Sequence, residues 1–478
     1  MRRAKILATL GPAFNEPEVL EALIANGLNA VRINMSHGTQ LEHAENIKRA
    51  RAAAEKLDRP LAVLIDLSGP KIRTGTLKDR FPVTLENGAS FVITSRQIEG
   101  NSMEVSTNFT DLPTIVQPGA TILLDDGAIE LRVTETNETD VISQVINGGL
   151  LNERKGINLP NTALPIPSLT KKDREDLVFA VEQNADYIAL SFVRKPEDCE
   201  EAKALIQQHG GRAKLVAKIE KAEAMMNLEA IVRATDGVMV ARGDLGVETS
   251  VELVPVYQKR IIEESIKAEK FVITATQMLQ SMISEPRPTR AEASDVANAV
   301  WDGSDAVMLS GETATGKFPV QAVATMCRII ESAESANPVG ASDIANWLGK
   351  QKGRTSRALC EAAAVAAEEL DVKKTAVFTE SGLMARRLSS VRPSQMIYAL
   401  TSDEHVRNAL ALIWGVQPLY HPKQDSTEKM LKTGEETLLN AGAVENGETL
   451  VIMAGRLSGL GLSSSVVVYT VGSNVPRR

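Results

Sequence analysis

The stretches that decide the fold are KIE (Lys218–Glu220), ARGDLG (Ala241–Gly246), ATQML (Ala275–Leu279) and MLSGET (Met308–Thr313). Each ends an apolar run and supplies groups able to hold a metal ion, a phosphate or a reacting oxygen. Helix-like segments separate the four stretches along the chain. In a (β/α)8 TIM barrel all strands end on one rim, where the catalytic groups lie, so this succession predicts that fold and an enzyme.

Eight strand-like runs occur along the chain, which is the number that closes such a barrel. Amphipathic segments with apolar residues at helical spacing lie between most of them, such as residues 16–27, 171–185 and 256–270. Alternation of strand and helix predicts a parallel sheet. The eight runs are KILATLGP (5–12), AVRINMSHG (30–38), LAVLIDLSGP (61–70), YIALSFVR (187–194), KLVAKIE (214–220), GVMVARGDL (237–245), FVITATQML (271–279) and AVMLSGET (306–313).

An insertion interrupts the barrel between the third run and the fourth. Residues 71–186 separate these runs, whereas a crossover needs only about a dozen residues. Short alternating apolar runs, broken by Gly, Asn and Asp, fill the first part of this interval. This pattern is typical of antiparallel strands, so we predict an inserted β-barrel lid domain at residues 71–157.

A third domain is predicted after the eighth run. The composition changes near ESANPVGASD (334–343), and an Ala-rich helix follows from Thr355, which indicates a C-terminal α/β domain. Its predicted strands are TAVFTESG (375–382), MIYALT (396–401), TLVIMAG (449–455) and SSVVVYTVG (464–472). Its turn TESG (Thr379–Gly382) has the chemistry to bind a phosphate through backbone amides, although spacing alone favours an ordinary strand-to-helix turn. The expected domains are therefore a barrel at 1–70 and 158–340, the lid at 71–157 and the α/β domain at 341–478.

Composition narrows the classes of function. The formal net charge of -8 and the aromatic content of 4% argue against nucleic-acid binding, which requires a basic surface. No apolar run approaches the roughly 20 residues of a membrane span. The cysteines Cys199, Cys327 and Cys360 lie far apart and match neither a disulfide framework nor a zinc site. We therefore expect a cytoplasmic enzyme without nucleic-acid or membrane partners.

Charged and hydroxyl residues at the ends of the runs predict a site for an anionic substrate and a metal ion. Glu220 and Asp244, with no Cys or His nearby in sequence, form a hard oxygen site suited to Mg²⁺ or Mn²⁺. A surface ion pair between Lys218 and Glu220 is the alternative, but it does not explain similar residues on four strands. The residues expected on the rim are Thr9, Arg32, Asn34, Ser36, His37, Asp66, Arg73, Ser191, Lys218, Glu220, Arg242, Asp244, Thr276 and Ser310.

Lys218 follows apolar residues and is expected to donate hydrogen bonds to an oxygen that gains negative charge. A Schiff-base role requires a neutral amine, which the neighbouring Glu220 disfavours. Arg32 and Arg73 are candidates for gripping a phosphate with planar guanidinium groups. No histidine is assigned to the chemistry, and His37 before a glycine is interpreted as a turn residue or a neighbour of a nucleotide.

Two hydroxyl residues are candidates for proton transfer. Thr276 and Ser310 lie where a hydroxyl or a bound water could pass a proton to the substrate. A purely structural role as a helix cap explains Thr276 equally well, and for Ser310 the two interpretations are evenly balanced.

These residues resemble the pyruvate kinase family, and the matching motifs occur in order over nearly the whole chain. The resemblance implies a homotetramer with a mobile β-barrel lid and a C-terminal effector domain. It also implies glycolytic transfer of a phosphoryl group from phosphoenolpyruvate to ADP, giving pyruvate and ATP. The motifs are RINMSHG (32–38), DLSGPKIRTG (66–75), GINLP (156–160), SFVRKPED (191–198), KIE (218–220), VARGDLGVE (240–248), ATQML (275–279), PRPTRAEASDVANAVWDGSDAVMLSGETATGKFP (286–319) and TESG (379–382).

The resemblance implies roles for individual residues. Glu220 and Asp244 correspond to the Mg²⁺ ligands, and Lys218 corresponds to the residue that stabilises the transferred phosphoryl group and the enolate. Ser310 resembles the residue that holds a water for proton relay. The implied substrate contacts are Arg32, Lys218, Gly243, Asp244 and Thr276; the implied nucleotide contacts are Asn34, Ser36, His37, Arg73 and Lys155, with Lys155 on the lid and Arg73 also catalytic.

One segment departs from the common family pattern. Many members have Asp-Thr-Lys-Gly-Pro-Glu where this chain has Asp66 to Lys71, and a K⁺ ion binds near that Glu. Lys71 brings a permanent positive charge instead, so the chain resembles the subgroup that works without K⁺. An exposed lysine at the lid hinge is the alternative. The oxygen ligands of a vestigial monovalent-cation site would come from Asn34, Ser36, Asp66 and Leu67.

The effector domain leaves its ligand open. Leu383 and Met384 after the TESG turn, and the loop AGRLSGLGLSSS (454–465), depart from the fructose-bisphosphate pattern. A phosphorylated effector such as a sugar monophosphate or a nucleotide, or no effector at all, remains compatible with these residues.

Two other functions compete with phosphoryl transfer. Mg²⁺-dependent barrel lyases that handle pyruvate enolate use similar carboxylates, but they need neither the long insertion nor the C-terminal domain. A catalytically inactive metabolite-binding regulator would have lost Lys218, Glu220 or Asp244, whereas all three are present.

Overall fold

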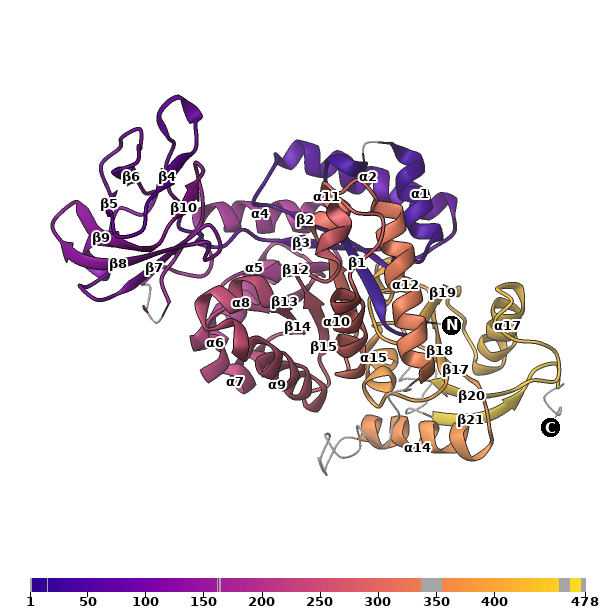
Figure 1. Cartoon of the computed structure of the whole chain (residues 1–478). Helices are drawn as coiled ribbons and strands as arrows, with labels where there is room; N and C mark the ends of the chain where they lie inside the picture. The colour runs from indigo at the N-terminus through magenta and orange to yellow at the C-terminus, as the bar shows by residue number, and fades with distance from the viewer. Residues whose placement is uncertain are drawn as a thin grey trace.

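A closed parallel barrel of eight strands forms the centre of the molecule (Figure 1). This computed structural model describes residues 2–14, 16–160, 162, 165–336, 355–454 and 465–473. The strands pair in the order β1-β16-β15-β14-β13-β12-β3-β2, and each lies within one of the eight predicted runs. They are β1 (Lys5–Thr9), β2 (Ala30–Asn34), β3 (Ala62–Asp66), β12 (Tyr187–Leu190), β13 (Lys214–Ile219), β14 (Gly237–Ala241), β15 (Phe271–Ala275) and β16 (Ala306–Leu309).

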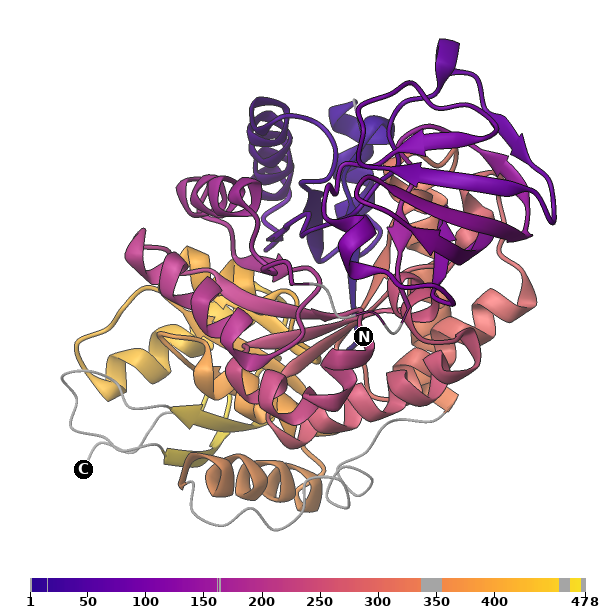
Figure 2. The ribbon, with the colours of Figure 1, turned by 90° about the vertical axis from the view of Figure 1, so that its left-hand side faces the viewer.

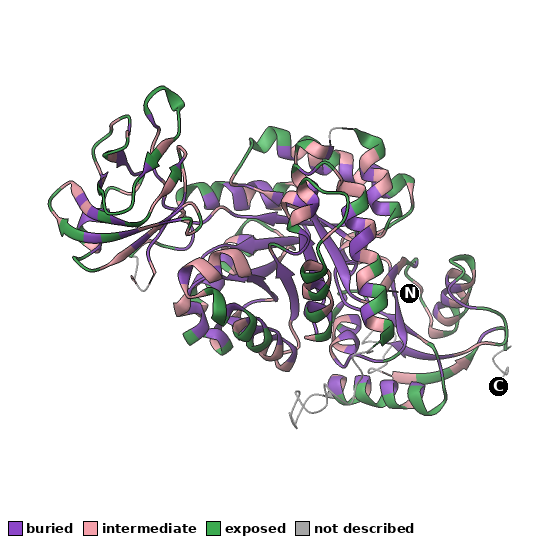
Figure 3. Cartoon of the chain, in the orientation of Figure 1, coloured by how far each residue is buried: buried purple, intermediate pink, exposed green. Residues whose placement is uncertain are grey.

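Burial on both faces explains why these strands read as continuous apolar runs. Every residue of β1, β3, β14 and β15 is buried, because helices cover the outside of the barrel (Figure 3). Thr39, Thr170 and Thr289 begin three of these helices through capping boxes. The helices are α1 (Pro17–Ala25), α2 (Gln40–Lys56), α4 (Lys171–Glu182), α5 (Pro196–Gln208), α6 (Ala222–Met226), α7 (Leu228–Ala234), α8 (Arg242–Glu248), α9 (Val254–Lys267), α10 (Arg290–Trp301), α11 (Gly311–Ala314) and α12 (Pro319–Ala336).

The insertion after β3 is an all-β lid with its own apolar core. Six strands pair in the order β11-β7-β8-β9-β5-β6, and β10 pairs with β4 in a separate ribbon. Isolated bridges from Arg73 to Gly156 and from Thr74 to Thr107 connect the two edges of the six-stranded sheet. The elements are β4 (Val83–Leu85), β5 (Ser90–Thr94), β6 (Glu104–Ser106), α3 (Leu112–Ile115), β7 (Thr121–Leu124), β8 (Ile129–Thr136), β9 (Asp140–Asn147), β10 (Gly149–Leu151) and β11 (Ile157–Asn158).

The C-terminal α/β domain contains a five-stranded sheet in the order β19-β18-β17-β20-β21. Sequence analysis missed β19, because Pro418 interrupts its pattern; an edge strand tolerates a proline. The predicted boundary at residue 340 lies outside the described residues. The elements are α14 (Thr355–Glu369), β17 (Lys374–Phe378), α15 (Leu383–Ser390), β18 (Met396–Thr401), α16 (Glu404–Leu410), β19 (Val416–Tyr420), α17 (Thr427–Asn440), β20 (Thr449–Ala454) and β21 (Ser465–Thr470).

The lid and the C-terminal domain lie at opposite ends of the barrel (Figures 1 and 2). The C-terminal domain packs against the ends where the barrel strands begin. There Lys5 donates a hydrogen bond to the carbonyl of Val416 at 2.6 Å, and the Tyr187 hydroxyl donates to the carbonyl of Ala409 at 2.6 Å. The rim where the strands end therefore faces the lid. Within the described ranges, no helix has both the length and the apolar composition needed to cross a bilayer.

Candidate active site

A buried charge cluster lies at the rim, at the ends of β2, β3 and β13. Asp66, the last residue of β3, accepts a hydrogen bond from Arg32 Nε at 2.6 Å and lies 3.1 Å from Lys218 Nζ. Lys218 also pairs with Glu220 at 2.9 Å and donates to the Ser191 hydroxyl at 2.7 Å. The structure therefore brings together rim residues that are far apart in sequence.

The cluster keeps Lys218 charged. Burial by itself lowers the pKa of a lysine, but the carboxylates of Asp66 and Glu220 outweigh it and raise the pKa of Lys218 above its usual range. Burial likewise acts to raise the pKa of Asp66, and the positive charges of Lys218 and Arg32 reverse this effect and lower it. Lys218 is thus a fixed ammonium at the rim, suited to a substrate oxygen that gains negative charge.

Two carboxylates at neighbouring strand ends form the candidate metal site. Glu220 is fully buried directly after β13, and its Oε2 accepts the backbone N–H of Phe192 at 2.7 Å. Asp244 lies in the first turn of α8 with its side chain 26% exposed, and its Oδ1 is 3.6 Å from Lys71 Nζ. Each carboxylate has one lysine ammonium beside it, Lys218 for Glu220 and Lys71 for Asp244.

The donor set fits a hard divalent cation. Mg²⁺ commonly takes one or two protein carboxylates and completes its shell with water and phosphate oxygens. Among the described residues there is no group of three or more His, Cys, Asp and Glu side chains that could hold a metal ion. Glu220 and Asp244 therefore match Mg²⁺ or Mn²⁺ better than zinc.

Thr276 lies at the end of β15 in a strained backbone conformation. Its φ of 71° is in the left-handed region, which costs a non-glycine residue roughly 1–3 kcal/mol. The Thr276 hydroxyl accepts the backbone N–H of Gly243 at 2.8 Å and donates to the carbonyl of Ala275 at 2.6 Å. The carbonyl of Thr276 accepts from Arg242 Nη2 at 2.6 Å. These contacts hold the predicted substrate contacts Thr276 and Gly243 side by side.

Ser310 follows β16, and its hydroxyl is buried without a hydrogen-bond partner within the described part of the chain. Its backbone N–H donates to Glu312 at 2.7 Å, and the same carboxylate accepts from the backbone N–H of Leu279 at 2.9 Å. Sequence reasoning missed this bracing role of Glu312, although the residue lies in the quoted MLSGET stretch. Buried hydroxyls usually have a hydrogen-bond partner, so the Ser310 hydroxyl is suited to bind a water or a substrate group.

The candidate nucleotide residues occupy the loop after β2 and the lid. Asn34 Oδ1 accepts the backbone N–H of Ser36 at 3.2 Å. Partial desolvation, followed by the charges of Arg73, Arg32 and Lys71, lowers the pKa of His37. The structure thus surrounds the exposed His37 with positive charge suited to phosphates.

Lys155 lies on the lid in the segment that bridges to Arg73: its backbone N–H donates to Thr74 Oγ1 at 2.9 Å, and its side chain pairs with Asp125 at 2.9 Å.

The proposed monovalent-cation residues are largely used by other contacts. Both oxygens of Asp66 already face Arg32 or Lys218, and the carbonyl of Leu67 accepts from the Ser191 hydroxyl at 2.7 Å. The Lys71 ammonium pairs with Asp244 at 3.6 Å.

A network beside the site had no signal in the sequence. Glu248 on α8 pairs with Lys221 at 2.8 Å and accepts from Asn158 of β11 at 2.8 Å. All three side chains are buried, so the network joins the lid hinge to the helix that carries Asp244. Only contacts between distant segments create it, which is why periodicity and motifs did not reveal it.

Comparisons with known proteins agree with this architecture. Residues 1–323 match the family model described as "Pyruvate kinase, barrel domain" and residues 357–468 match "Pyruvate kinase, alpha/beta domain". The chain is 40% identical to a pyruvate kinase of Clostridium acetobutylicum, covering 95% of this chain and 96% of that protein. It is 41% identical to one of Bacillus licheniformis, covering 100% and 82%. A solved pyruvate kinase structure from Cryptosporidium parvum superposes with a TM-score of 0.91 at 36% identity, covering 98% and 96%.

Proposed function

The chain belongs to the pyruvate kinase family, and on this premise we propose that its rim transfers a phosphoryl group from phosphoenolpyruvate to ADP. In this reaction the bond from phosphorus to the enol oxygen breaks, and a bond to a terminal oxygen of ADP forms. The enolate that remains takes a proton on carbon and becomes pyruvate. The enzyme is therefore a phosphotransferase of glycolysis.

The observation that supports this function best is the buried ammonium of Lys218 between Asp66 and Glu220. Phosphoryl transfer depends on alignment and charge neutralisation more than on covalent chemistry. Lys218 and Arg32 supply fixed positive charge for the phosphoryl oxygens and for the enolate oxygen. Asp66 orients both cations, since it holds one on each carboxylate oxygen.

Glu220 and Asp244 would hold Mg²⁺ or Mn²⁺ at the rim. The metal, when bound, supplies positive charge to phosphate and enolate oxygens. Gly243 and Thr276 would contact phosphoenolpyruvate beside Arg32. On the nucleotide side Asn34, Ser36, His37 and Arg73 would bind ADP, and Lys155 would reach it when the lid closes.

The proton for the enolate carbon would come through hydroxyl groups. The neighbouring cations lower the pKa of the exposed His37, which disfavours its protonated, proton-donating form. The Thr276 hydroxyl lies in the predicted substrate-binding region, and the free hydroxyl of Ser310 is suited to hold a water. We assign proton delivery to a relay of these two hydroxyls and water.

Lys71 would replace the charge of K⁺. Its ammonium stands at the rim, 3.6 Å from Asp244, and supplies a permanent positive charge there. The Asp66 carboxylate is already neutralised by Arg32 and Lys218, which leaves a monovalent cation few free oxygens.

Several wider properties follow from family membership. We propose a cytoplasmic homotetramer in which the domains comprise 1–70 with 158–340, 71–157 and 341–478. The three cysteines are free, which suits a reducing compartment. A phosphorylated effector is proposed for the TESG turn, and much of the loop expected beside it, residues 455–464, lies outside the described residues.

The decisive assay measures pyruvate formation from phosphoenolpyruvate, ADP and Mg²⁺ in buffer free of K⁺ and NH₄⁺, and then with K⁺ added. We expect full activity without K⁺. The variant Lys71→Glu should become K⁺-activated, whereas Lys71→Met should lose activity without gaining a response to K⁺. If the wild-type enzyme required K⁺, the proposed role of Lys71 would be wrong, but the assignment as a kinase would stand. Absence of activity in both buffers would refute the kinase and favour an inactive metabolite-binding regulator.

A lyase of pyruvate enolate is the second candidate, since it would use the same two carboxylates. The lid and the C-terminal domain disfavour it, because such an enzyme needs neither. Formation of ATP together with pyruvate excludes it directly.

A further inference from the structure

Lys221 and Glu248 form a buried ion pair beside the two candidate metal ligands. Lys221 directly follows Glu220 in the chain, and Glu248 lies four residues after Asp244 on α8. The side chains of Lys221 and Glu248 are 9% and 3% exposed, and Lys221 Nζ lies 2.8 Å from Glu248 Oε1. Separation of the pair would leave two buried charges without partners, so the contact is held closed. The pair therefore ties the segment that carries Glu220 to the helix that carries Asp244.

The helix α8 is fixed at both of its ends. At its start, the backbone N–H of Gly243 donates to Thr276 Oγ1 at 2.8 Å. At its end, Glu248 is held by the ion pair and by Asn158 Nδ2, which donates to Glu248 Oε1 at 2.8 Å. Residues four apart lie on the same face of a helix, about one turn from each other. A shift of Glu248 would therefore move the carboxylate of Asp244.

Lys221 also contacts the residue that orients Glu220. The Lys221 ammonium lies 5.7 Å from the centre of the Phe192 ring, which is within the range of a cation–π contact. The backbone N–H of Phe192 donates to Glu220 Oε2 at 2.7 Å. Phe192 has a φ of 54°, in the left-handed region that a bulky residue keeps only where its surroundings hold it there. Lys221 thus supports both sides of the candidate metal site.

We propose that Lys221 and Glu248 form a clamp of positioning residues that sets the separation of Glu220 and Asp244 for a divalent cation. This role rests on the proposed function, because it takes these two carboxylates as the ligands of Mg²⁺ or Mn²⁺. Mg²⁺ demands a nearly ideal octahedral arrangement of oxygen atoms at short distances. An error in the spacing of the two carboxylates would therefore weaken its binding, although neither residue of the clamp is itself assigned as a ligand.

A direct effect of charge and a positioning role predict opposite results for Lys221. Removal of a nearby ammonium would by Coulomb's law strengthen the binding of a divalent cation, whereas loss of the clamp would weaken it. Removal of the Glu248 charge would weaken binding under either mechanism. Removal of both charges leaves the net charge of the pair unchanged, so only the positioning role predicts weaker binding in that double variant.

Titration of the full chain with Mn²⁺, followed by the electron paramagnetic resonance signal of the free ion, measures binding without relying on kinase activity. The relevant site is the one that Glu220→Gln removes. Lys221→Met and Glu248→Gln are each expected to weaken Mn²⁺ binding there about tenfold, as is usual when a partner of a metal ligand is lost. The double variant should lose no more than either single variant, because both changes open the same clamp. Lys221→Arg keeps the charge and should retain most of the affinity.

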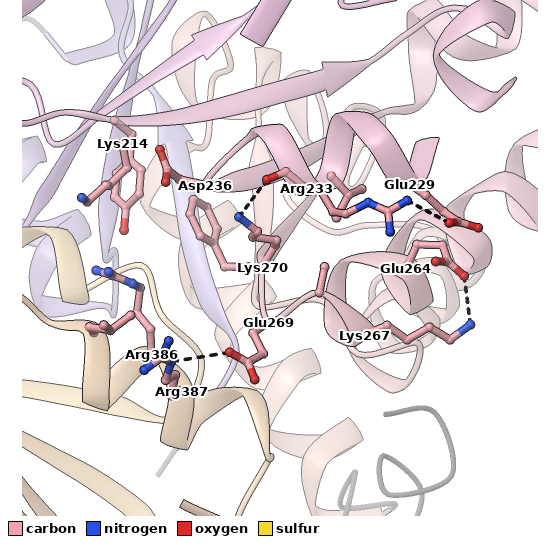
Figure 4. Close-up of a pocket in the computed structure, with 15 residues that line it drawn as sticks. Lys214, Glu229, Arg233, Asp236, Glu264, Lys267, Glu269, Lys270, Arg386 and Arg387 are labelled. Carbon is pink, nitrogen blue, oxygen red and sulfur yellow. Dashed lines mark hydrogen bonds and ion pairs between the residues drawn. The ribbon is translucent and has the colours of Figure 1, made fainter. Parts of the chain in front are cut away.

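Two variants far from the rim serve as controls. Arg392→Met breaks the buried pair with Asp305 at the other end of the barrel, so it lowers stability without touching the clamp. Arg233→Gln removes a cation from the exposed pair with Glu229 on α7, beside the cavity between the barrel and the C-terminal domain (Figure 4). The Mn²⁺ affinity of both controls should change less than about twofold, because distant sites act independently.

Unchanged Mn²⁺ affinity in Lys221→Met and Glu248→Gln would overturn the clamp, and so would tighter binding in Lys221→Met, which would indicate a direct effect of charge. Either result would leave the assignment as a kinase standing. An equal loss in Arg392→Met would also overturn the clamp, since lowered stability alone would then explain the weaker binding.

Failure of the wild type to bind Mn²⁺ would refute Glu220 and Asp244 as metal ligands, and the clamp with them. Thermal unfolding of each variant checks its fold. If Lys221→Met does not fold, the double variant with Glu248→Gln supplies the test, because it leaves no buried charge of the pair without its partner. Wild-type affinity in the folded double variant would overturn the clamp.

Discussion

The two ends of the barrel each bury a lysine, and the two lysines behave in opposite ways. Lys218 at the rim faces Asp66 and Glu220, which raise its pKa. Lys5 at the other end has only the carbonyl of Val416 as its hydrogen-bond acceptor within the described residues, and burial lowers its pKa to about 7. At the rim, two carboxylates keep Lys218 positively charged for a ligand. At the base, Lys5 acts only as a hydrogen-bond donor that joins the barrel to the C-terminal domain. Substitutions at the rim should therefore change catalysis, and substitutions at the base should change stability.

The largest effect is expected from loss of the metal at the rim. Chelation with EDTA should lower the rate about 10³-fold or more, because a divalent cation contributes several kcal/mol of charge stabilisation. Asp244→Asn should raise the Mg²⁺ concentration needed for half-maximal rate about a hundredfold. The exposed Asp371→Asn, far from the rim in the C-terminal domain, is the control. A rate that survives complete chelation would contradict the assignment of Glu220 and Asp244.

The next effect concerns proton delivery. Thr276→Ala should slow exchange of solvent hydrogen into pyruvate about 10²-fold, since positioned acid–base groups contribute at least that factor. NMR of pyruvate in deuterated water measures the exchange directly. The control is Thr315→Ala, an exposed threonine near the rim. Unchanged turnover and unchanged exchange in Thr276→Ala would exclude this hydroxyl from the relay.

At the base, Arg392→Met should destabilise the chain by about 3–5 kcal/mol, because it leaves Asp305 buried without its cation partner. The pair is separated by 3.1 Å, and both side chains are at most 5% exposed. Chemical denaturation gives the free energy of unfolding, and kcat of the folded variant should change less than threefold. Adding Asp305→Asn to Arg392→Met should recover part of the lost free energy of unfolding. A large fall in kcat with intact stability would remove the contrast between the two ends.

The smallest effect is a pH dependence of stability at Lys5. Its pKa falls from 10.5 in the unfolded chain to about 7 in the folded protein. Lys5 therefore opposes folding most below pH 7, where both states are protonated, and this opposition fades as the pH rises towards 10.5. Relative to Lys5→Met, the wild-type free energy of unfolding should rise by roughly 1 kcal/mol per pH unit between pH 7 and 9. A constant difference would show that Lys5 keeps its ordinary pKa.

The same contrast explains what the sequence could predict. Barrel strands are buried on both faces, so their apolar runs were visible without a structure, and their ends marked the rim. The triad of Arg32, Asp66 and Lys218 was not visible as a unit, because its members come from three strands. β19 was hidden by Pro418, whose place at a sheet edge depends on the tertiary order.

The base of the barrel was less predictable than the rim. The hydrogen bonds of Lys5 to Val416 and of Tyr187 to Ala409 depend on how the C-terminal domain docks. No spacing along the chain encodes that docking. Lys71 shows the same limit, since the departure from the family pattern was evident but its partner Asp244 was not.

The most direct test of the central claim compares kcat for pyruvate formation in Lys218→Met and Lys5→Met, with stability measured on the same samples. We predict that Lys218→Met loses about 10³-fold in kcat, as expected for removal of a preorganised charge, while Lys5→Met stays within threefold of wild type. Equal losses in both variants, or activity retained in Lys218→Met, would contradict the account.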